Sequence, residues 1–193
     1  FTTLIKSVIL ISAFLVMLCS LNYVKQNDIL KIEYPILILS SILGMLVMVS
    51  SNDLIVFYVG LELQSLALYV LAAFKRDNIL SSESGLKYFI LSALSSGLLL
   101  YGCSLIYGFS SSTNFDLIYQ NSGSIEYGII FGIVFVLVGL AFKITAVPFH
   151  MWAPDVYDGS PTSVTIIFAI LPKIAALTVF INFLYCLLYT SDA

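Results

Sequence analysis

The run GIIFGIVFVLVGL, residues 128–140, contains no charged and no polar side chain. A transmembrane β-strand alternates apolar and polar residues over about ten positions, because one of its faces meets lipid and the other a polar interior. This run is apolar on every face, so it predicts an α-helix surrounded by lipid or by other apolar helices. The fold class that it indicates is therefore all-α.

Five further segments are similar to this run in length and composition. A bilayer core about 30 Å thick needs about 20 mostly apolar residues per helix. The segments that meet or approach that length are residues 1–21, 35–51, 54–74, 85–109, 127–150 and 162–189. The chain of 193 residues is 60% hydrophobic and 10% charged, whereas soluble domains carry about 25% charged residues. We therefore predict a polytopic transmembrane bundle of about six helices, with residues 1–193 in a single membrane domain.

Basic residues mark one side of this predicted bundle. With six crossings the connections alternate between sides, and one side receives Lys25, Lys31, Lys75, Arg76 and Lys87. Cytoplasmic loops carry an excess of Lys and Arg, so we expect the basic loops on the matrix or cytoplasmic side. No basic stretch of the kind that binds phosphate backbones is present, which argues against nucleic-acid binding.

Three charged residues lie inside predicted membrane segments. Glu62 is near the middle of the third segment, Lys143 is well inside the fifth, and Lys173 is near the centre of the sixth. A charge at the bilayer centre costs about 2.5 to 3.5 kcal/mol on insertion scales, so such residues face a protein or water interior and are candidates for function. One glutamate cannot pair with two lysines, and groups in this situation can take and release protons as a coupled set. We predict proton transfer, and the structural alternative is a Glu–Lys pair that only fixes helix register.

Several polar residues near these charges are candidates for relaying protons. Tyr58, Ser65 and Tyr69 recur at helical spacing around Glu62 and form one polar stripe that could hold water. His150 is the single histidine, and histidine changes charge near neutral pH, which suits a relay. The alternative for His150 is a hydrogen-bonding role at the membrane interface.

Two prolines predict helix breaks beside the two lysines. Pro148 lies five residues after Lys143, and Pro172 immediately precedes Lys173. A proline inside a helix leaves the carbonyl about four residues earlier without its donor, and broken membrane helices are tolerated where they line a cavity. Carbonyls freed in this way can order water beside a lysine. For Pro148 the alternative is that it simply ends the fifth helix.

The sequence contains no motif for a cofactor or a metal ion. It lacks GxGxxG, a cysteine cluster, a histidine pair for haem and the P-loop GxxxxGK[ST]. We therefore expect no cofactor, no metal and no catalytic redox site in this chain. The energy for proton movement then has to come from an ion gradient or from a partner.

Three stretches together carry a family resemblance. They are GLELQSLALYVLAAF (residues 60–74), ESGLKYFILSALSSG (residues 83–97) and LVGLAFKITAVPFHMWAPDVYDGSPTSV (residues 137–164). They resemble the subunit 2 family of respiratory complex I, NADH:ubiquinone oxidoreductase, whose bacterial members are the N subunits. The third stretch, with LPKIAAL at residues 171–177, is similar to this family rather than to the antiporter-like subunits 4 and 5.

This resemblance implies a fold and roles for individual residues. Antiporter-like subunits contain two inverted helical repeats, and a glutamate, a helix-breaking lysine and a further lysine form the first half-channel. These positions match Glu62, Lys143 and Lys173. Glu62 is then expected to modulate Lys143, and Lys173 to pass protons toward the central axis, coupled to quinone reduction elsewhere. By the same resemblance NADH, FMN, Fe–S clusters and ubiquinone bind other subunits, and the partners are membrane-arm subunits and lipids.

Length and composition add two expectations and leave two other functions open. The family's second repeat has no counterpart in residues 1–193, so we expect a split or truncated subunit whose remaining repeat is on a second polypeptide. The 14 Phe and 12 Tyr residues, with no targeting peptide, favour a mitochondrial inner membrane, with a bacterial plasma membrane as the alternative. The other functions are an independent cation/proton antiporter and a structural scaffold without transport.

Overall fold

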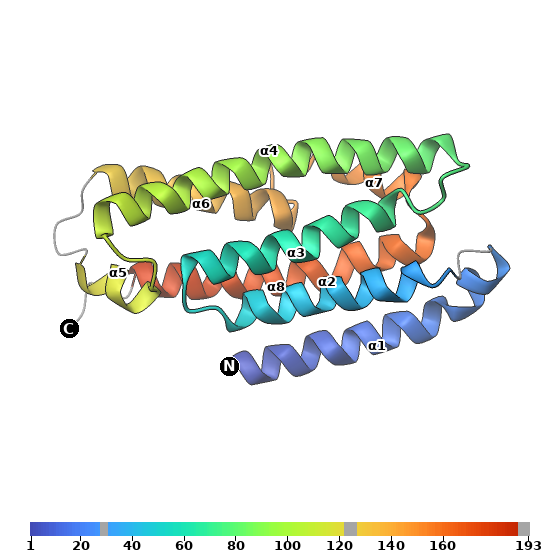
Figure 1. Cartoon of the computed structure of the whole chain (residues 1–193), viewed down its shortest axis with the longest axis horizontal. Helices are drawn as coiled ribbons and strands as arrows, with labels where there is room; N and C mark the ends of the chain where they lie inside the picture. The colour runs from blue at the N-terminus through green and yellow to red at the C-terminus, as the bar shows by residue number, and fades with distance from the viewer. Residues whose placement is uncertain (28–30, 122–126, 189–193) are drawn as a thin grey trace.

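The computed structural model describes residues 1–27, 31–121 and 127–188, and its long helices run side by side along one axis (Figure 1). Six of them are long and apolar enough to cross a membrane. These are α1 (Thr2–Gln26), α2 (Glu33–Ser50), α3 (Leu54–Ala72), α4 (Ile79–Ser110), α6 (Tyr127–Ile144) and α8 (Thr162–Leu188). Extended pairing in the described residues is confined to one isolated bridge between Asp53 and Asn114. The prediction of an all-α, multi-pass membrane bundle is confirmed.

Two short helices and several helix ends differ from the sequence prediction, and the largest shifts are at the start of α4 and the end of α6. The helices α5 (Phe115–Asn121) and α7 (Ala153–Gly159) occupy connections that the apolar pattern did not mark as helical. Helix α4 begins at residue 79 instead of 85, and α6 ends at residue 144 instead of 150. The predicted end of the last segment, residue 189, lies outside the described residues.

The early start of α4 comes from polar residues that hydrogen-bond locally. The Asn78 side chain accepts a hydrogen bond from the Leu80 N–H at 3.0 Å and so caps the helix. The Ser81 hydroxyl donates to the Ala72 carbonyl at the end of α3, at 2.8 Å. The polar residues before position 85 therefore belong to α4, because the Asn78 amide and the Ser81 hydroxyl form hydrogen bonds with backbone groups.

Glycines join the helices into two closely packed pairs. A Cβ on Gly44 of α2 would lie 2.5 Å from the backbone nitrogen of Gln64 on α3, and Gly60 meets α2 in the same way. A Cβ on Gly102 of α4 would lie 2.7 Å from the Gly132 carbonyl oxygen of α6. Small residues let membrane helices approach this closely. The α2/α3 pair and the α4/α6 pair then face each other along a seam between α3 and α4.

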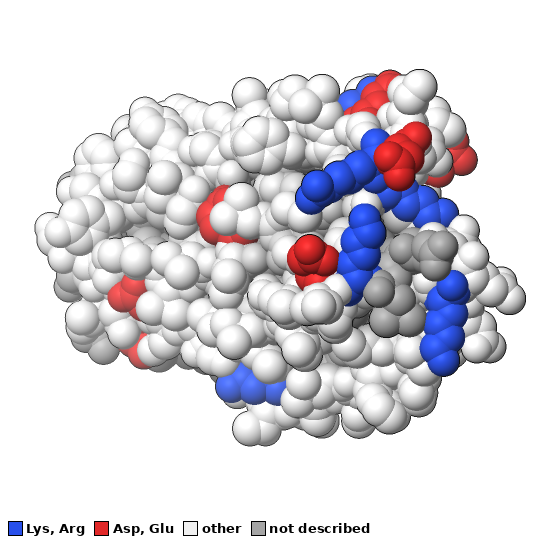
Figure 2. All heavy atoms as spheres, turned by 45° about the vertical axis from the view of Figure 1, so that its right-hand side comes forward, with Lys and Arg blue, Asp and Glu red and all other residues white. Residues whose placement is uncertain are grey.

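Basic residues gather at one end of the bundle. The end of α1, the start of α2, the end of α3 and the start of α4 lie together there (Figure 1), and they carry Lys25, Lys31, Lys75, Arg76 and Lys87. Figure 2 shows blue side chains concentrated at this end of the face it displays. The grouping predicted from alternating crossings is present in the structure.

Candidate functional site

Lys143 lies in the last turn of α6 and is buried in the seam, with 6% of its surface exposed. Its Nζ donates to the Ser92 hydroxyl at 2.5 Å, to the Ser65 hydroxyl at 2.9 Å and to the Tyr69 hydroxyl at 3.4 Å. Ser65 and Tyr69 come from α3 and Ser92 from α4. An ammonium group has three donors, so these three hydroxyls match its hydrogen-bonding capacity.

The hydroxyls around Lys143 also bond to one another. The Tyr69 hydroxyl donates to the Ser92 hydroxyl at 2.7 Å, and Ser65 donates to the Leu61 carbonyl at 2.7 Å. Ser65 and Tyr69 share a face because they are four residues apart on one helix. Each hydroxyl can both donate and accept, so Lys143, Ser92 and Tyr69 form a connected set of exchangeable protons.

Glu62 lies one turn before Ser65 on α3 and is half-buried. Its Oε1 atom is buried and has no hydrogen-bond partner among the described residues. The carboxylate interacts electrostatically with Lys143 and with the Tyr58 hydroxyl. No ion pair within 4.0 Å joins Glu62 to Lys143 in the described part of the chain, where the ion pairs formed are those of Lys87. The purely structural Glu–Lys pair considered from the sequence is therefore not formed.

Lys173 follows Pro172 on α8, and its ammonium group lies over a tyrosine ring. The helical assignment of α8 continues through Pro172 without interruption. The Lys173 Nζ lies 5.5 Å from the centre of the Tyr157 ring on α7. The Tyr157 hydroxyl oxygen is buried and has no hydrogen-bond partner among the described residues. Lys173 therefore meets a ring face, and no hydroxyl of the described residues accepts a hydrogen bond from it.

In the part of the chain that the structure describes, an aromatic row rather than a chain of hydrogen bonds connects the two lysine environments. The Tyr69 ring packs edge-on against Tyr88 with centroids 4.9 Å apart, and Tyr88 stacks on Trp152 at 4.8 Å. Trp152 then meets Tyr157 at 6.2 Å. The structure brings together Lys143, Ser65 and Tyr69, with Tyr58 and Glu62 in the next turns of α3, and it leaves Lys173 beyond this row.

The chain turns sharply after Lys143. Thr145 has a left-handed φ of 63°, which ends α6, and the Val147–Pro148 peptide bond is cis. Pro148 thus lies in the turn that follows the helix, and the helix ends before it. His150 is exposed on this turn, and no hydrogen bond to its side chain is formed within the described residues. The relay role of His150 stays a prediction.

Ser92 was not identified from the sequence, although it makes the shortest contact with Lys143. A serine inside an apolar helix is common and often bonds only to its own backbone. One signal was present, because serines recur along α4 at positions 81, 84, 92, 95 and 96. The structure buries all five of them. Buried serines repeated at helical spacing indicate a helix face that packs against other protein rather than lipid.

Comparisons with known proteins agree on the type of fold. The family model described as "NADH:quinone oxidoreductase/Mrp antiporter, TM" matches residues 51–192. NADH-quinone oxidoreductase subunit N of Pelagibacter ubique is 69% identical over 184 residues, which are 95% of this chain and 39% of that protein. Subunit N of Rhodospirillum rubrum is 57% identical over 178 residues, 91% of this chain and 37% of that protein. The chain thus spans less than two fifths of the length of these relatives.

Solved structures show the same similarity. A chain of respiratory complex I from Thermus thermophilus with bound aureothin matches with a TM-score of 0.78 and 34% identity. The match covers 92% of this chain and 39% of the complex I chain. A chain of the Mrp complex from Dietzia sp. has a TM-score of 0.80 and 24% identity, with 93% and 34% covered. The second likeness concerns the fold alone.

Proposed function

Because the chain belongs to the NADH:quinone oxidoreductase/Mrp antiporter transmembrane family, we propose that it transfers protons within a membrane, with Lys143 as the group that takes and releases them. The relatives named above are subunits of NADH-quinone oxidoreductase. We propose the corresponding role for this chain: a membrane subunit without redox chemistry of its own, in an enzyme that couples quinone reduction to proton translocation.

The observation that carries this proposal is the environment of Lys143. An isolated buried ammonium is very costly, and its cost falls when the charge is paired or hydrogen-bonded. Here the partners are three neutral hydroxyls, which can accept from a charged lysine and can donate to a neutral one. A carboxylate in contact would hold the proton on the lysine, whereas hydroxyls support both protonation states.

The remaining predicted residues have supporting roles in this proposal. Glu62 modulates the charge on Lys143 from the turn of α3 next to Ser65. Tyr58 extends the polar stripe of α3 one turn beyond Glu62. Ser65, Ser92 and Tyr69 position the lysine and relay its proton, and Lys173 passes the proton onward past the aromatic row. The cofactors NADH, FMN, Fe–S clusters and ubiquinone belong, in this proposal, to other subunits of the assembly, and other membrane-arm subunits are the partners.

Two further expectations belong to this proposal. A mitochondrial inner membrane was predicted from composition, while the relatives reported above are bacterial, so cell fractionation with an antibody to this chain decides between the two membranes. In both cases we propose that the basic end faces the matrix or cytoplasm. A separate polypeptide carrying the second repeat would appear as a distinct mass in the intact assembly, and a single continuous chain would contradict it.

The Lys143→Ala variant tests the proposal in membrane vesicles that contain the protein in its assembly. We expect NADH-driven acidification, followed with a pH-sensitive dye, to fall by about 100-fold or more, because a positioned proton-transfer group contributes at least about that factor. Lys25→Ala, which removes an exposed lysine at the basic end, is the matched control and keeps wild-type acidification.

Two results, one from this experiment and one from purification, contradict the proposal. If Lys143→Ala keeps both acidification and quinone reduction, the chain is a scaffold and its buried lysine has no part in transport. If the protein purifies outside any redox assembly and exchanges cations for protons in liposomes, it is an independent antiporter.

A further inference from the structure

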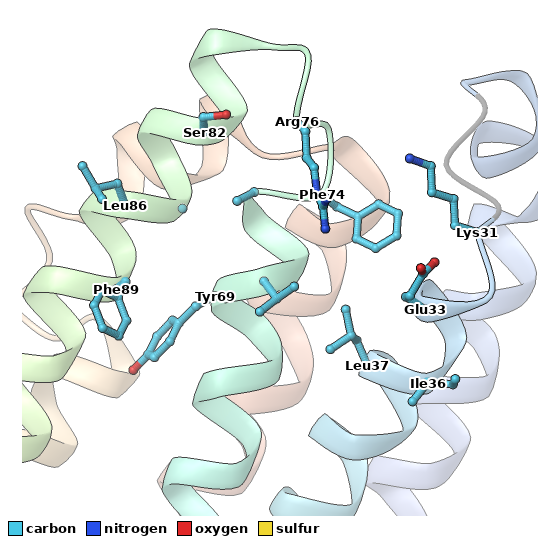
Figure 3. A pocket seen from close by; sticks show the side chains of 13 residues that line it. Lys31, Glu33, Ile36, Leu37, Tyr69, Phe74, Arg76, Ser82, Leu86 and Phe89 are labelled. Atoms are coloured by element: carbon cyan, nitrogen blue, oxygen red, sulfur yellow. The ribbon is translucent and has the colours of Figure 1, made fainter.

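An open groove lies at the basic end of the bundle, between α2, α3 and α4 (Figure 3). Its volume is about 800 Å³. The apolar lining comprises Ile36, Leu37, Val70, Phe74, Leu86 and Phe89. Val70 and Leu86 expose 51% and 60% of their surface, so this lining is available to an occupant.

The mouth of the groove carries two cations without an ion-pair partner. Lys31 and Arg76 line the groove, and Figure 3 shows them at one end with the Phe74 ring between them. Neither forms an ion pair with another described residue, whereas Lys87 pairs with Glu83 and Asp155 at 2.8 Å. The cations of the mouth are therefore available to an anion.

Glu33 also lines the groove and leaves the three charges of the mouth at a net value of +1. Lys75 lies close by, but its ammonium donates to the Asn27 side chain at 2.9 Å and sits over the Tyr23 ring. The positive charge offered to an occupant therefore comes from Lys31 and Arg76.

We propose that this groove binds one anionic phospholipid, with its phosphate between Lys31 and Arg76 and an acyl chain along the apolar lining. Basic pockets between transmembrane helices recognise anionic head groups, and an acyl chain is stabilised by each CH₂ group that it buries against an apolar surface. The groove meets both requirements. Its charged residues lie at the end of the bundle, where a lipid head group would be, and its apolar lining extends toward the middle, where an acyl chain would be.

The proposed lipid lies next to Lys143 and its hydroxyl partners Ser65, Tyr69 and Ser92, but makes no contact with the lysine itself. Tyr69 lines the inner part of the groove, and its hydroxyl contacts Ser92 and Lys143. An acyl chain seated there covers the Tyr69 ring on its groove side. The lipid site does not rest on the proton-transfer proposal and can be tested without any transport assay.

Native mass spectrometry of the full-length protein in mild detergent tests lipid binding directly. The probes are phosphatidylglycerol and phosphatidylcholine with identical acyl chains. We expect the wild type to retain phosphatidylglycerol preferentially, and Lys31→Gln with Arg76→Gln to weaken it by about 25-fold, at about five-fold per cation. The control, Lys6→Gln with Lys25→Gln, removes the same charge away from the groove and keeps the preference.

Two further variants test the geometry. Val70→Trp places a large side chain on the exposed lining and should expel both lipids equally. Glu33→Gln removes the negative charge of the mouth and should strengthen phosphatidylglycerol binding. Unchanged preference in the double Gln variant, or equal losses in it and in its control, overturns the proposal. A photoreactive residue at position 86 that crosslinks to a polypeptide instead of lipid in native membranes also overturns it.

Discussion

Lys143 and Lys173 are both membrane lysines in adjacent helices, but they differ in what surrounds the ammonium group. Three hydroxyls from α3 and α4 contact Lys143, which α6 places in the seam between these two helices. Each ammonium group also lies near a tyrosine ring, Lys143 at 5.8 Å from the Tyr69 centre and Lys173 at 5.5 Å from the Tyr157 centre. The difference is that Lys173 has the ring without a hydroxyl partner among the described residues. Hydroxyls can stabilise either protonation state of an amine, whereas a ring face attracts only the cation. The comparison indicates that the environment of Lys143 suits proton exchange better than that of Lys173.

The largest effect is expected from Lys143→Arg. Arginine keeps the positive charge but is not deprotonated in proteins, so it can hold structure and cannot release a proton. We expect proton pumping in membrane vesicles to fall by about 100-fold, as for the loss of a general acid or base. Lys25→Arg serves as the control, and near-normal pumping in Lys143→Arg would mean that Lys143 acts only as a fixed charge.

A smaller effect is expected from Ser92→Ala. This change removes the acceptor at 2.5 Å from the Lys143 Nζ and leaves a buried donor without a partner. An unsatisfied buried group costs about 1 to 3 kcal/mol, so pumping should fall by about ten-fold. The control is Ser104→Ala on the same helix, whose hydroxyl bonds to its own backbone at Tyr101 and is exposed. Equal effects of the two serine changes would remove the special role of Ser92.

The two tyrosines beside the lysines give a direct contrast. Tyr69→Phe removes a hydroxyl that bonds to Ser92 and Lys143, and one hydrogen bond of about 1 kcal/mol corresponds to a loss of about five-fold in pumping. Tyr157→Phe removes a hydroxyl without a partner in the described residues and keeps the ring over Lys173, so pumping stays within about two-fold of wild type. Equal losses in the two variants would show that Lys173 also depends on a hydroxyl.

The sequence was sufficient for the six long membrane helices, and it singled out the charged residues whose role as a site stays a prediction. Long apolar runs have to become membrane helices, and a charge such as Glu62 or Lys143 stands out against them. The sequence was not sufficient for α5 and α7, because helices of seven residues are too short for an apolar period to be read. It also placed the end of α6 six residues late, since the left-handed turn at Thr145 has no glycine to mark it.

The contacts of each charge needed the fold. Ser92 is 51 residues from Lys143 in the chain, and it joins the site because Gly102 and Gly132 draw α4 and α6 together. Lys173 was grouped with Lys143 from its depth in the membrane, and depth contains no information on which neighbour a side chain faces. The aromatic row between the lysines could not be inferred, because its members come from four helices or connections.

The smallest effect is expected at the start of α3, the helix that supplies Ser65 and Tyr69. Asp53 caps this helix, with its carboxylate accepting from the Thr113 hydroxyl at 2.6 Å and from the Ile55 N–H at 2.8 Å. Burial raises the pKa of Asp53, but the hydrogen bonds from Thr113 and from the Ile55 and Val56 N–H groups outweigh it and hold the pKa below its ordinary value of 3.8.

A carboxyl group whose folded pKa is below its unfolded pKa stabilises the fold above the unfolded value, and this stabilisation is lost as pH falls through the folded value. The unfolding temperature in detergent should therefore drop on acidification below about pH 4, and Asp53→Asn should drop less because it cannot be protonated. Asp77→Asn, in the connection between α3 and α4, is the charge-matched control. Pumping in Asp53→Asn should match wild type, because Asp53 lies at the opposite end of α3 from the Lys143 hydroxyls. A large pumping loss in this variant would mean that the seam depends on how α3 begins, and the contrast between the two lysines would then reflect helix position rather than local chemistry.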